Sequence, residues 1–502
     1  MAQLRECLHY AFGTAPAMYF SSLNVLSGMA RAFIERSFES HYAERPTVGQ
    51  STFWWSVLNC SLPVGMATGS AISAIALDRL GRKTTVISIK NLLTILGGLL
   101  QFCSVQFFNS FELLIVGRLI AGIGLGLVPS LAIYISECRV PGQAANVGTF
   151  VIGSMLIQTA LGSAVGLPVL LGTRQLWHYV MLVPLFHSLV HFSLVFFLKE
   201  SPKHLYVTLH KEREAREAFD YHLPTGDWPA VKALYDKERQ LQSDKHASLR
   251  EVLATKHYRW PIIVCLACVL GNKTVGSDIA WFYSTEVIES FGLSGQRAKW
   301  FSVAVLQGLA VVVALLHIVF QIVRRTPRRL LFLSGVAIGN VAMLFVLIGG
   351  QVDNKDISVF FGAVGLLLSA FANVCGPFFL LPVLPLEIAP QTVRARASGV
   401  SFALSAASML TITLLYPTAS LWLGSLAVLP LFMGGIVCFV FLYYKMPESK
   451  GKTVVEVTSI WRDSSSDRHL REKDNRENED EERRQDTGAA GAEKNENAVG
   501  AV

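Results

Sequence analysis

Long apolar runs of membrane-spanning length recur along this chain from residue 8 to residue 444. A helix needs about 20 mostly apolar residues to cross the hydrocarbon core of a bilayer, so each run is long enough to span it. Hydrophobic residues make up 52% of the 502 residues and charged residues 16%, with a mean hydropathy of +0.42, whereas a soluble domain carries about a quarter of its residues as charges. No segment alternates apolar and polar residues in the manner of an outer-membrane barrel. The composition therefore predicts an all-α membrane protein with many spans.

The apolar runs predict about twelve transmembrane helices, arranged as two six-helix bundles on either side of a charged linker. The first run follows only MAQLRECLHY and has no small-residue cleavage site, so we interpret it as the first span and not as a signal peptide. The predicted domains are an N-terminal bundle (1–198), a helical linker (199–257), a C-terminal bundle (258–445) and a tail (446–502). The spans are expected near 8–30, 52–77, 84–106, 111–135, 148–170, 176–198, 260–284, 299–323, 330–350, 357–386, 399–418 and 422–444.

Lysine and arginine are more frequent in the loops after the second, eighth and tenth spans than in the loops on the opposite side. The positive-inside rule therefore predicts that both termini and the linker are cytoplasmic. The linker runs KEREAREAF and VKALYDKERQ combine charges with apolar residues at helical spacing, which is typical of short amphipathic helices lying against the end of a bundle. After about residue 459 the tail is almost entirely polar, so we expect it to be disordered.

Each predicted bundle carries the same loop chemistry. A basic turn joins its second and third helices (DRLGRK, 78–83; RRTPRR, 324–329), and a glutamate follows its fourth helix (SEC, 136–138; LEIAPQTVRAR, 386–396). Such a duplicated unit is the architecture of a transporter whose halves move about a central site. Arginines of one loop can bind a glutamate on a neighbouring helix end and close the cytoplasmic side; the alternative is that the basic residues only orient the helices. The candidate cytoplasmic gate residues are Asp78, Arg79, Arg82, Arg118, Glu137, Glu200, Arg328, Arg329, Glu387, Arg394 and Glu448.

Seven motifs resemble those of the sugar-porter branch of the major facilitator superfamily, and most of all those of the facilitative glucose transporters. They are SFELLIVGRLIAGIGLGL (110–127), DRLGRK (78–83), YISE (134–137), KESPKHL (199–205), YSTEVIESFG (283–292), GPFFLLPVLPLEIAPQTVR (376–394) and MPESKGKTVVEV (446–457). The resemblance implies the fold of that superfamily, a substrate cavity near the bilayer midplane and transport by alternating access. It also implies location in the plasma membrane.

Sugar binding needs amides that donate and accept hydrogen bonds, together with an aromatic face. In glucose transporters, glutamines and asparagines of helices five, seven and eight and a tryptophan of helix ten supply these groups. The resemblance places Ile152, Asn272, Lys273, Asp278, Val312 and Pro382 at these positions, with Gln158 further along helix five, and Ala144 where an arginine is expected after the fourth helix. The scaffold is therefore kept, but most of the sugar-contacting side chains are replaced. The candidate substrate-binding residues are Asn24, Gln158, Asn272, Lys273, Asp278, Phe282, Tyr283, Phe378 and Phe379.

Lys273 and Asp278 are two charges inside the seventh predicted span. A lone ion at the centre of a bilayer costs about 3 kcal/mol on insertion scales, and such residues are usually functional. Three interpretations remain open: both contact a substrate, for which Lys273 suits an anionic or carbonyl-bearing solute; both form an internal ion pair; or both lie in a water-filled cavity with no specific role.

Other polar groups carry less weight. His187 and His191 are four residues apart on the sixth span and share one face, where helix–helix hydrogen bonding is favoured over a metal or proton site. Cys265 and Cys268 are interpreted as small packing residues. The sequence has no Walker A pattern, catalytic triad, metal-hydrolase motif or nucleic-acid module. It therefore predicts no enzyme activity, no cofactor, no bound metal and no nucleic-acid partner.

Three functions follow as hypotheses. The first is a facilitative carrier for a hexose or sugar-like solute, with the lipid bilayer as its surroundings. The second is the same mechanism for a non-hexose solute, such as an organic anion or a polyol, with or without a coupled proton. The third is a non-transporting sensor that signals through its charged tail. The sequence leaves the oligomeric state open.

Overall fold

The computed structural model describes residues 2–139, 147–224, 226–241, 255–293, 295–452 and 454–461, and every regular element in these ranges is helical. Two sequence predictions fall outside them: the tail expected to be disordered after about residue 459, of which only Ser459–Trp461 is described and is helical, and the loop position Ala144.

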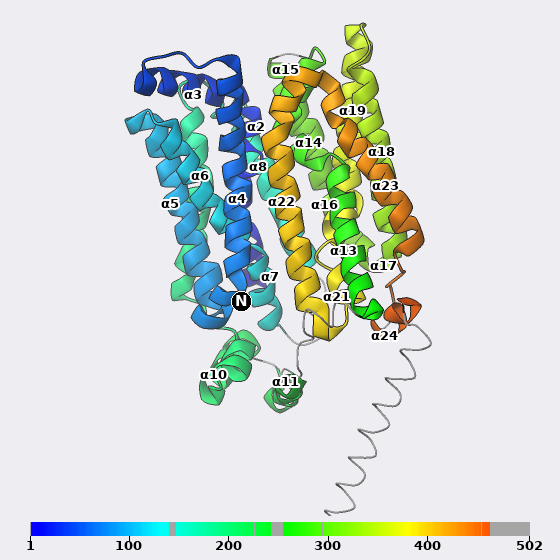
Figure 1. Ribbon diagram of the computed structural model, residues 1–502. Coiled ribbons are helices and arrows are strands. Elements are labelled where there is room, and N and C mark those ends of the chain that lie inside the picture. The colour runs from blue at the N-terminus through cyan, green and yellow to red at the C-terminus, as the bar shows by residue number, and fades with distance from the viewer. Residues whose placement is uncertain are drawn as a thin grey trace, which may run out of the picture.

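The first half of the chain forms a bundle in which several spans consist of more than one helical segment (Figure 1). Its elements are α1 (Ala2–Phe12), η1 (Ala15–Tyr19), α2 (Ser22–Val25), α3 (Ser27–Tyr42), α4 (Val48–Leu80), η2 (Thr84–Ile89), α5 (Lys90–Cys103), η3 (Ser104–Phe108), α6 (Phe111–Gly126), α7 (Pro129–Glu137), α8 (Val147–Val165), η5 (Trp177–Met181), α9 (Leu182–Ser193) and η6 (Leu194–Phe196).

Short linker helices follow, then the second bundle. The linker contains η7 (His204–Thr208), α10 (Glu212–His222) and α11 (Trp228–Leu241). The second bundle and the start of the tail contain α13 (Lys256–Thr274), α14 (Ser277–Ser290), α15 (Gln296–Trp300), η8 (Phe301–Gln307), α16 (Gly308–Phe320), α17 (Ile322–Arg325), α18 (Arg328–Gly349), α19 (Lys355–Cys375), α20 (Pro377–Leu380), α21 (Leu384–Ile388), α22 (Gln391–Leu423), η9 (Gly424–Val428), α23 (Leu429–Lys445), α24 (Val454–Thr458) and η10 (Ser459–Trp461).

Twelve crossings account for these elements. By length and composition, nine segments of the described chain can span a membrane. One of them, Arg396–Lys445, has 50 residues, about 75 Å of helix, and holds both α22 and α23, so it crosses twice. The long helix α4 and the broken segment that runs from α1 to α3 supply the other two crossings.

Several spans are interrupted where the sequence predicts one continuous helix. The first span is broken around Gly13 and Pro16. In the fourth span, α6 ends at Gly126 and α7 begins at Pro129. The tenth is broken at Gly376, directly before Pro377. Proline lacks an N–H and restricts the residue before it, so it begins a new helix more readily than it continues one. Hydropathy does not register such breaks, because the residues remain apolar throughout.

Helices α4 and α6 pack at very close range through glycine. A β-carbon at Gly65 would lie 2.1 Å from the carbonyl oxygen of Leu119, and one at Gly69 would lie 2.2 Å from that of Ile123. Only a residue without a side chain permits this approach, as expected for small residues at a membrane helix interface. The glycines at these two positions therefore set the distance between α4 and α6.

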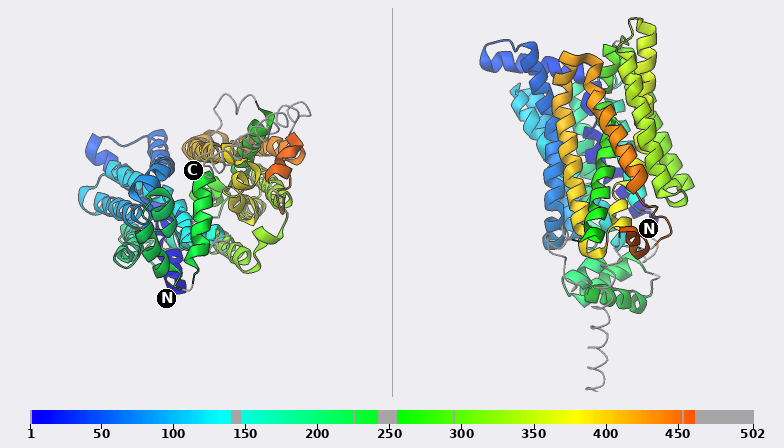
Figure 2. Two further views of the ribbon diagram at one scale, coloured as in Figure 1. Left: turned by 90° about the horizontal axis from the view of Figure 1, so that it is seen from below. Right: turned by 45° about the vertical axis from the view of Figure 1, so that its right-hand side comes forward.

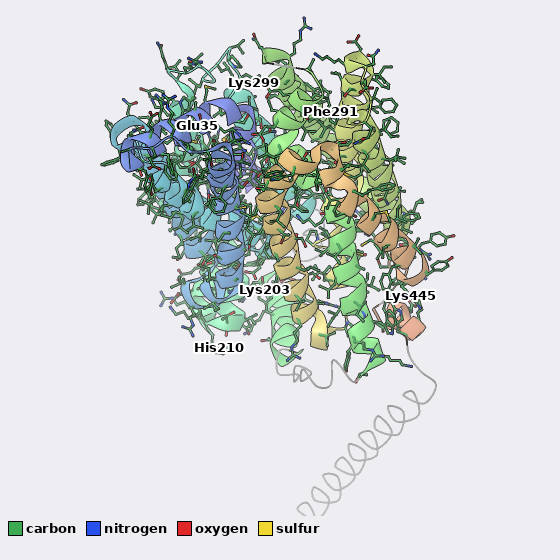
Figure 3. The ribbon with its side chains drawn as sticks, turned by 45° about the horizontal axis from the view of Figure 1, so that its top comes forward. Glu35, Lys203, His210, Phe291, Lys299 and Lys445 are labelled. Carbon is green, nitrogen blue, oxygen red and sulfur yellow. The ribbon has the colours of Figure 1, made fainter. Side chains whose placement is uncertain are left out.

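The two bundles lie side by side, with the first half (blue to cyan) next to the second (green to orange) when viewed along their length (Figure 2). The linker helices α10 and α11 lie beyond one end of the bundles, which we call the linker end; α3 and α15 mark the far end (Figure 1). Lys203, His210 and Lys445 lie toward the linker end and Glu35, Phe291 and Lys299 toward the far end (Figure 3). Helices α4 and α22 run side by side at the far end and separate toward the linker end (Figure 1).

Candidate functional site

The seventh span is broken at the two predicted charges. Helix α13 ends at Thr274 and α14 begins at Ser277, and Gly276 between them has φ +78°. This left-handed conformation favours glycine, and a β-carbon there would also lie 2.3 Å from Cε of Met343. The break therefore depends on glycine both for its backbone conformation and for space.

Lys273 and Asp278 form an ion pair across this break. Nζ of Lys273 lies 3.1 Å from Oδ1 and 3.0 Å from Oδ2 of Asp278, with side chains 10% and 5% exposed. Residues five apart in a continuous helix point about 140° away from each other, so the break is what brings the two charges together. Lys273 lies in the last turn of α13 and Asp278 in the first turn of α14, where the helix dipoles favour a cation and an anion respectively. Of the three interpretations, the internal ion pair is the one that the structure contains.

Amide and hydroxyl contacts connect the break to α19 of the same half. Asn272 Nδ2 donates to Oδ1 of Asn373 at 2.7 Å, and the Ser369 hydroxyl donates to the Val275 carbonyl at 2.8 Å. The carbonyl left free by the interrupted helix is thus satisfied inside the protein, as a backbone at membrane depth requires.

The aromatic candidates lie on α14 and on the tenth span. Phe282 packs against Phe20 of the first half, with ring centroids 4.8 Å apart, and Tyr283 donates its hydroxyl to the Thr413 carbonyl at 2.7 Å. On the tenth span, Phe379 is stacked on His317 of α16 at 4.5 Å, while Phe378 packs edge-on to Phe379.

Asn24 joins the two halves. Its Nδ2 donates to the Trp281 carbonyl at 3.3 Å and to the Ser284 hydroxyl at 2.7 Å, and its Oδ1 accepts from the Thr285 N–H at 3.1 Å. Both ends of the amide are therefore occupied by α14. In this arrangement Asn24 holds the halves together and does not present its amide to a solute.

An ion pair reinforces this contact. Arg31 of α3 lies 3.2 Å from Glu286 of α14, and its guanidinium carbon lies 5.2 Å from the ring centroid of Trp55. Charged groups in a bilayer need partners, and here each partner comes from a different half. We call Asn24, Arg31, Ser284, Thr285 and Glu286 the far-end junction.

Gln158 is placed differently from the other candidates. Its Nε2 donates to the Ala11 carbonyl, and its Oε1 is buried without a partner among the described residues. It therefore joins α8 to α1 within the first half, and these contacts do not bring it to Lys273, Asp278 or the far-end junction.

The first predicted loop cluster closes within the first half. Nε of Arg82 lies 3.3 Å from Oε2 of Glu137, to which the Ser201 hydroxyl also donates. Glu200 accepts from the backbone N–H groups of Lys83 and Ser201, each at 2.9 Å. Burial raises the pKa of Glu200, and the two N–H groups act in the opposite direction.

The second half repeats the same construction. Nη2 of Arg328 lies 3.2 Å from Oε1 of Glu387, and the Ser449 hydroxyl donates to Oε2 of the same carboxylate. Glu448 accepts from the backbone N–H groups of Arg328 and Arg329 at 2.9 and 3.1 Å. Each cluster thus joins an arginine of the basic turn, the glutamate after the fourth helix and a glutamate after the sixth. We call them the linker-end clusters; both contain the predicted contact between a loop arginine and a glutamate on a neighbouring helix end, and both connect helices of one half.

Three further gate candidates differ in their surroundings. Arg79 is exposed, the side chain of Asp78 lies outside the described part, and Nε of Arg394 donates to the Ala389 carbonyl at 3.4 Å.

The assignment of Arg118 to the cytoplasmic gate is corrected. Helix α6 begins after Ser110, next to Asn109, which donates to Ser40 of the far-end helix α3. Arg118 therefore lies about two turns in from the far end. It is fully buried, and its three guanidinium nitrogens have no hydrogen-bond partner among the described residues. The sequence placed it correctly at the start of the fourth span, but grouped it with loops at the other end of that span.

A cavity of about 220 Å³ lies between the halves toward the linker end. Its lining includes Thr149 and Phe150 of α8, His317 and Gln321 on the α16 side, and Glu387 of the second linker-end cluster. None of the nine predicted substrate-binding residues lines it. In the described part of the chain, no group of three or more His, Cys, Asp or Glu side chains is arranged to hold a metal ion.

The family model described as "Sugar (and other) transporter" matches residues 10–461 of the chain. The chain belongs to this family. It is 26% identical over 460 residues to the dog protein (Canis lupus familiaris) "Solute carrier family 2, facilitated glucose transporter member 3", covering 90% of each chain. The human protein of that name is 25% identical over 445 residues, covering 87% of each.

Solved structures show the same fold. The inward-open conformation of the xylose transporter XylE from E. coli superposes with a TM-score of 0.70 at 17% identity, covering 92% of this chain and 100% of XylE. The proton:xylose symporter XylE bound to 6-bromo-6-deoxy-D-glucose gives 0.68 at 17% identity, with the same coverage. These likenesses confirm the predicted twelve-helix architecture with two six-helix bundles.

Three residues in the contacts described above were not predicted from the sequence of this sugar transporter family member. Glu286 lies within the YSTEVIESFG motif and Arg31 in a charged loop, and neither was singled out. An acidic residue inside an apolar span requires a partner, which was the available signal. His317 of α16 is 1% exposed and stacks on Phe379 of the tenth span, and its single polar ring in a long apolar run was the corresponding signal there.

Proposed function

We propose that the chain is a facilitative carrier that moves a hexose or sugar-like solute across the plasma membrane by alternating access. In this proposal the linker end faces the cytoplasm, so both termini are cytoplasmic. The chain is not an enzyme, and its family membership carries the transport class.

The positions of the contacts and of the cavity between the two halves support the proposal most strongly. The halves are joined by the far-end junction, while the linker-end clusters close within each half and a cavity lies between the halves near that end. A carrier with its outer side closed and its inner side accessible has this pattern. The likeness to the inward-open XylE conformation agrees with it.

The far-end junction consists of contacts that can be broken together. Hydrogen bonds contribute about 0.5–1.5 kcal/mol each, and a partly exposed ion pair contributes up to about 1 kcal/mol. A junction of three hydrogen bonds and one ion pair is therefore worth a few kcal/mol, which contacts formed at the other end in the outward-facing state can offset. The equilibrium between two such states responds to a bound solute.

The break in the seventh span supplies the moving part near the solute. Helix α14 carries the second half's share of the far-end junction, and α13 extends from the break toward the linker end. Because Gly276 interrupts the hydrogen-bond ladder, α14 can tilt while α13 stays in place. The Lys273–Asp278 pair keeps both charges neutralised during this motion, and the Asn272–Asn373 amides offer the donors and acceptors that a polyhydroxylated solute needs.

Uptake and exchange of labelled solute test the proposal. In cells lacking hexose carriers, we expect surface expression of the chain to give saturable hexose uptake that a protonophore does not abolish. Preloading with unlabelled hexose should accelerate uptake, because a loaded carrier reorients faster than an empty one. Flat hexose uptake with verified surface expression would refute the hexose assignment, and a panel with a polyol and an organic anion would identify a different solute. Flat uptake for the whole panel would refute transport itself.

A truncation separates a carrier from a sensor. Removing residues 459–502 should leave the flux unchanged in a carrier, because the twelve spans and both linker-end clusters precede this segment.

A further inference from the structure

Four buried polar side chains form a hydrogen-bonded network inside the first half. They are Lys90 and Asn91 of α5, His191 of α9 and His9 of α1, with exposures of 0, 0, 0 and 3%. In the described part of the chain, no ion pair includes Lys90. Its Nζ donates to the Gly13 carbonyl at 2.6 Å and to Oδ1 of Asn91 at 2.7 Å. A lysine at this depth without a carboxylate partner needs an explanation.

The direction of every hydrogen bond between these four side chains follows from Lys90. An ammonium group only donates, so the Asn91 atom facing it is the oxygen. The Asn91 NH2 group therefore faces the other way, donating to the Ile87 carbonyl at 2.6 Å and to Nδ1 of His191 at 2.8 Å. His191 must accept at Nδ1 and, when neutral, carries its hydrogen on Nε2. That hydrogen points to Nδ1 of His9, 2.9 Å away, so His9 must accept.

Within these four side chains, an added proton finds no acceptor. On Nδ1 of His9, it faces the N–H of His191. If His191 shifts its own hydrogen to Nδ1, that hydrogen faces the NH2 of Asn91. Asn91 cannot turn to offer its oxygen while Lys90 donates to that oxygen. Protonation therefore breaks at least one hydrogen bond between α1, α9 and α5.

The His9 end of this hydrogen-bonded network lies beside a small water-sized cavity at the linker end. This cavity, about 30 Å³, is lined by His9 together with Glu6, Tyr134, Cys138 and His222. These are the titratable groups that face His9 from α1, α7 and α10, and Glu6 itself pairs with Arg139. Lys90 is the charged group on the side of His191. Histidine is the side chain that titrates near neutral pH, and His9 lines this cavity, so its ring can exchange protons with water there.

We propose that His9 and His191 form a proton-binding site on the cytoplasmic side of the carrier, and that proton binding there releases α1 from α5 and α9. The cytoplasmic placement and the transport readout rest on the proposed function. Helix α1 is the first segment of the broken first span, and later segments of that span carry Asn24 and Arg31. Release of α1 therefore affects the contacts of the far-end junction through the backbone of that span.

Non-titrating replacements keep the hydrogen bonds and remove the proton site. In His9→Asn, Oδ1 takes the place of the accepting Nδ1; in His191→Gln, the amide both accepts and donates as the neutral ring does. Lys90→Met frees Asn91 to turn, so protonated His191 gains an acceptor. His187→Gln is the matched control, since His187 lies one turn away on α9 and contacts the Val183 carbonyl of its own helix.

The full-length protein in proteoliposomes gives the transport readout. Lowering the pH on the linker side from about 7.5 to about 5.5 should change the uptake rate about three- to tenfold in the unmodified chain, from the loss of one or two hydrogen bonds. The change should fall below about twofold in the His9→Asn/His191→Gln double variant and in Lys90→Met. The control should respond like the unmodified chain, and acid on the far side should have no effect on any of them.

Thermal unfolding of the same proteins in lipid nanodiscs gives a readout that needs no solute. The Tm of the unmodified chain should fall more on acidification than the Tm of the double variant. Equal falls in both would overturn the proton site, as would a pH response lost in His187→Gln or kept in full in Lys90→Met. If the Tm behaves as expected but no solute moves, the transport proposal fails and the proton site stands.

Discussion

Removing the Asn24 amide should open the far end of the carrier. The substitution Asn24→Ala deletes all three hydrogen bonds between this side chain and α14: two from Nδ2, to the Trp281 carbonyl and the Ser284 hydroxyl, and one to Oδ1, from the Thr285 N–H. The Arg31–Glu286 pair remains, so the junction is weakened without introducing an unpaired charge.

The size of the effect follows from the number of bonds. At about 0.5–1.5 kcal/mol for each, three hydrogen bonds correspond to about 2–4 kcal/mol. That energy changes the ratio of far-end-open to far-end-closed molecules by a factor of about 30 to 900. If the closed state is favoured by several kcal/mol at the start, the open population rises by nearly the same factor.

A native cysteine reports this opening. Cys60 of α4 is 5% exposed and its thiol lies 3.7 Å from the Leu410 carbonyl of α22, on the seam between the halves. With the other cysteines replaced, the modification rate of Cys60 by a membrane-impermeant thiol reagent from the far side should rise more than about tenfold in Asn24→Ala, because the lost hydrogen bonds correspond to a factor of about 30 or more. Asn109→Ala is the control, because Asn109 bonds to Ser40 within the first half.

An unchanged labelling rate in Asn24→Ala would refute the far-end junction as the contact that keeps the halves together. An equal rise in Asn109→Ala would show that the labelling reports general loosening of the far end.

Three further predictions concern stability and are read as Tm shifts of the purified protein. Lys273→Met leaves Asp278 buried and unpaired, which costs about 3–5 kcal/mol, whereas Lys273→Met combined with Asp278→Asn should cost far less, and equal losses would contradict the ion pair. Glu387→Gln should lower stability by about 1–3 kcal/mol through the lost charge-assisted contact with Arg328, and no change would mean that the second linker-end cluster does not hold its half together. Gly65→Val should prevent α4 from packing on α6 and cost more than about 3 kcal/mol, with wild-type stability counting against the close approach.

The sequence predicted the helices well because hydropathy measures the quantity that membrane insertion depends on. It also predicted the members of both linker-end clusters, since Arg82, Glu137, Arg328 and Glu387 recur at matching positions of a duplicated unit. What it could not supply is the partner of each charge. Arg82 pairs within its own half, and no periodicity distinguishes that from a pair between halves.

The candidate substrate site shows the same limit in another form. Helical spacing places Lys273 and Asp278 on different faces, and they meet only because Gly276 interrupts the helix. Arg31 and Glu286 are separated by 255 positions, so only the folded structure brings them together. Arg118 was assigned to the wrong end because a motif gives a position along the chain but not the depth of the side chain in the membrane.

The linker-end clusters have a consequence for how the protein is made. The first cluster is complete once Glu200 and Ser201 have been synthesised, before any residue of α13 exists. The first six helices can therefore settle into their final arrangement in the bilayer while the ribosome is still translating the linker. The second linker-end cluster cannot form until Glu448, just after the last span, has been synthesised. Until then the second half lacks these contacts, and the nascent protein is most exposed to quality-control degradation.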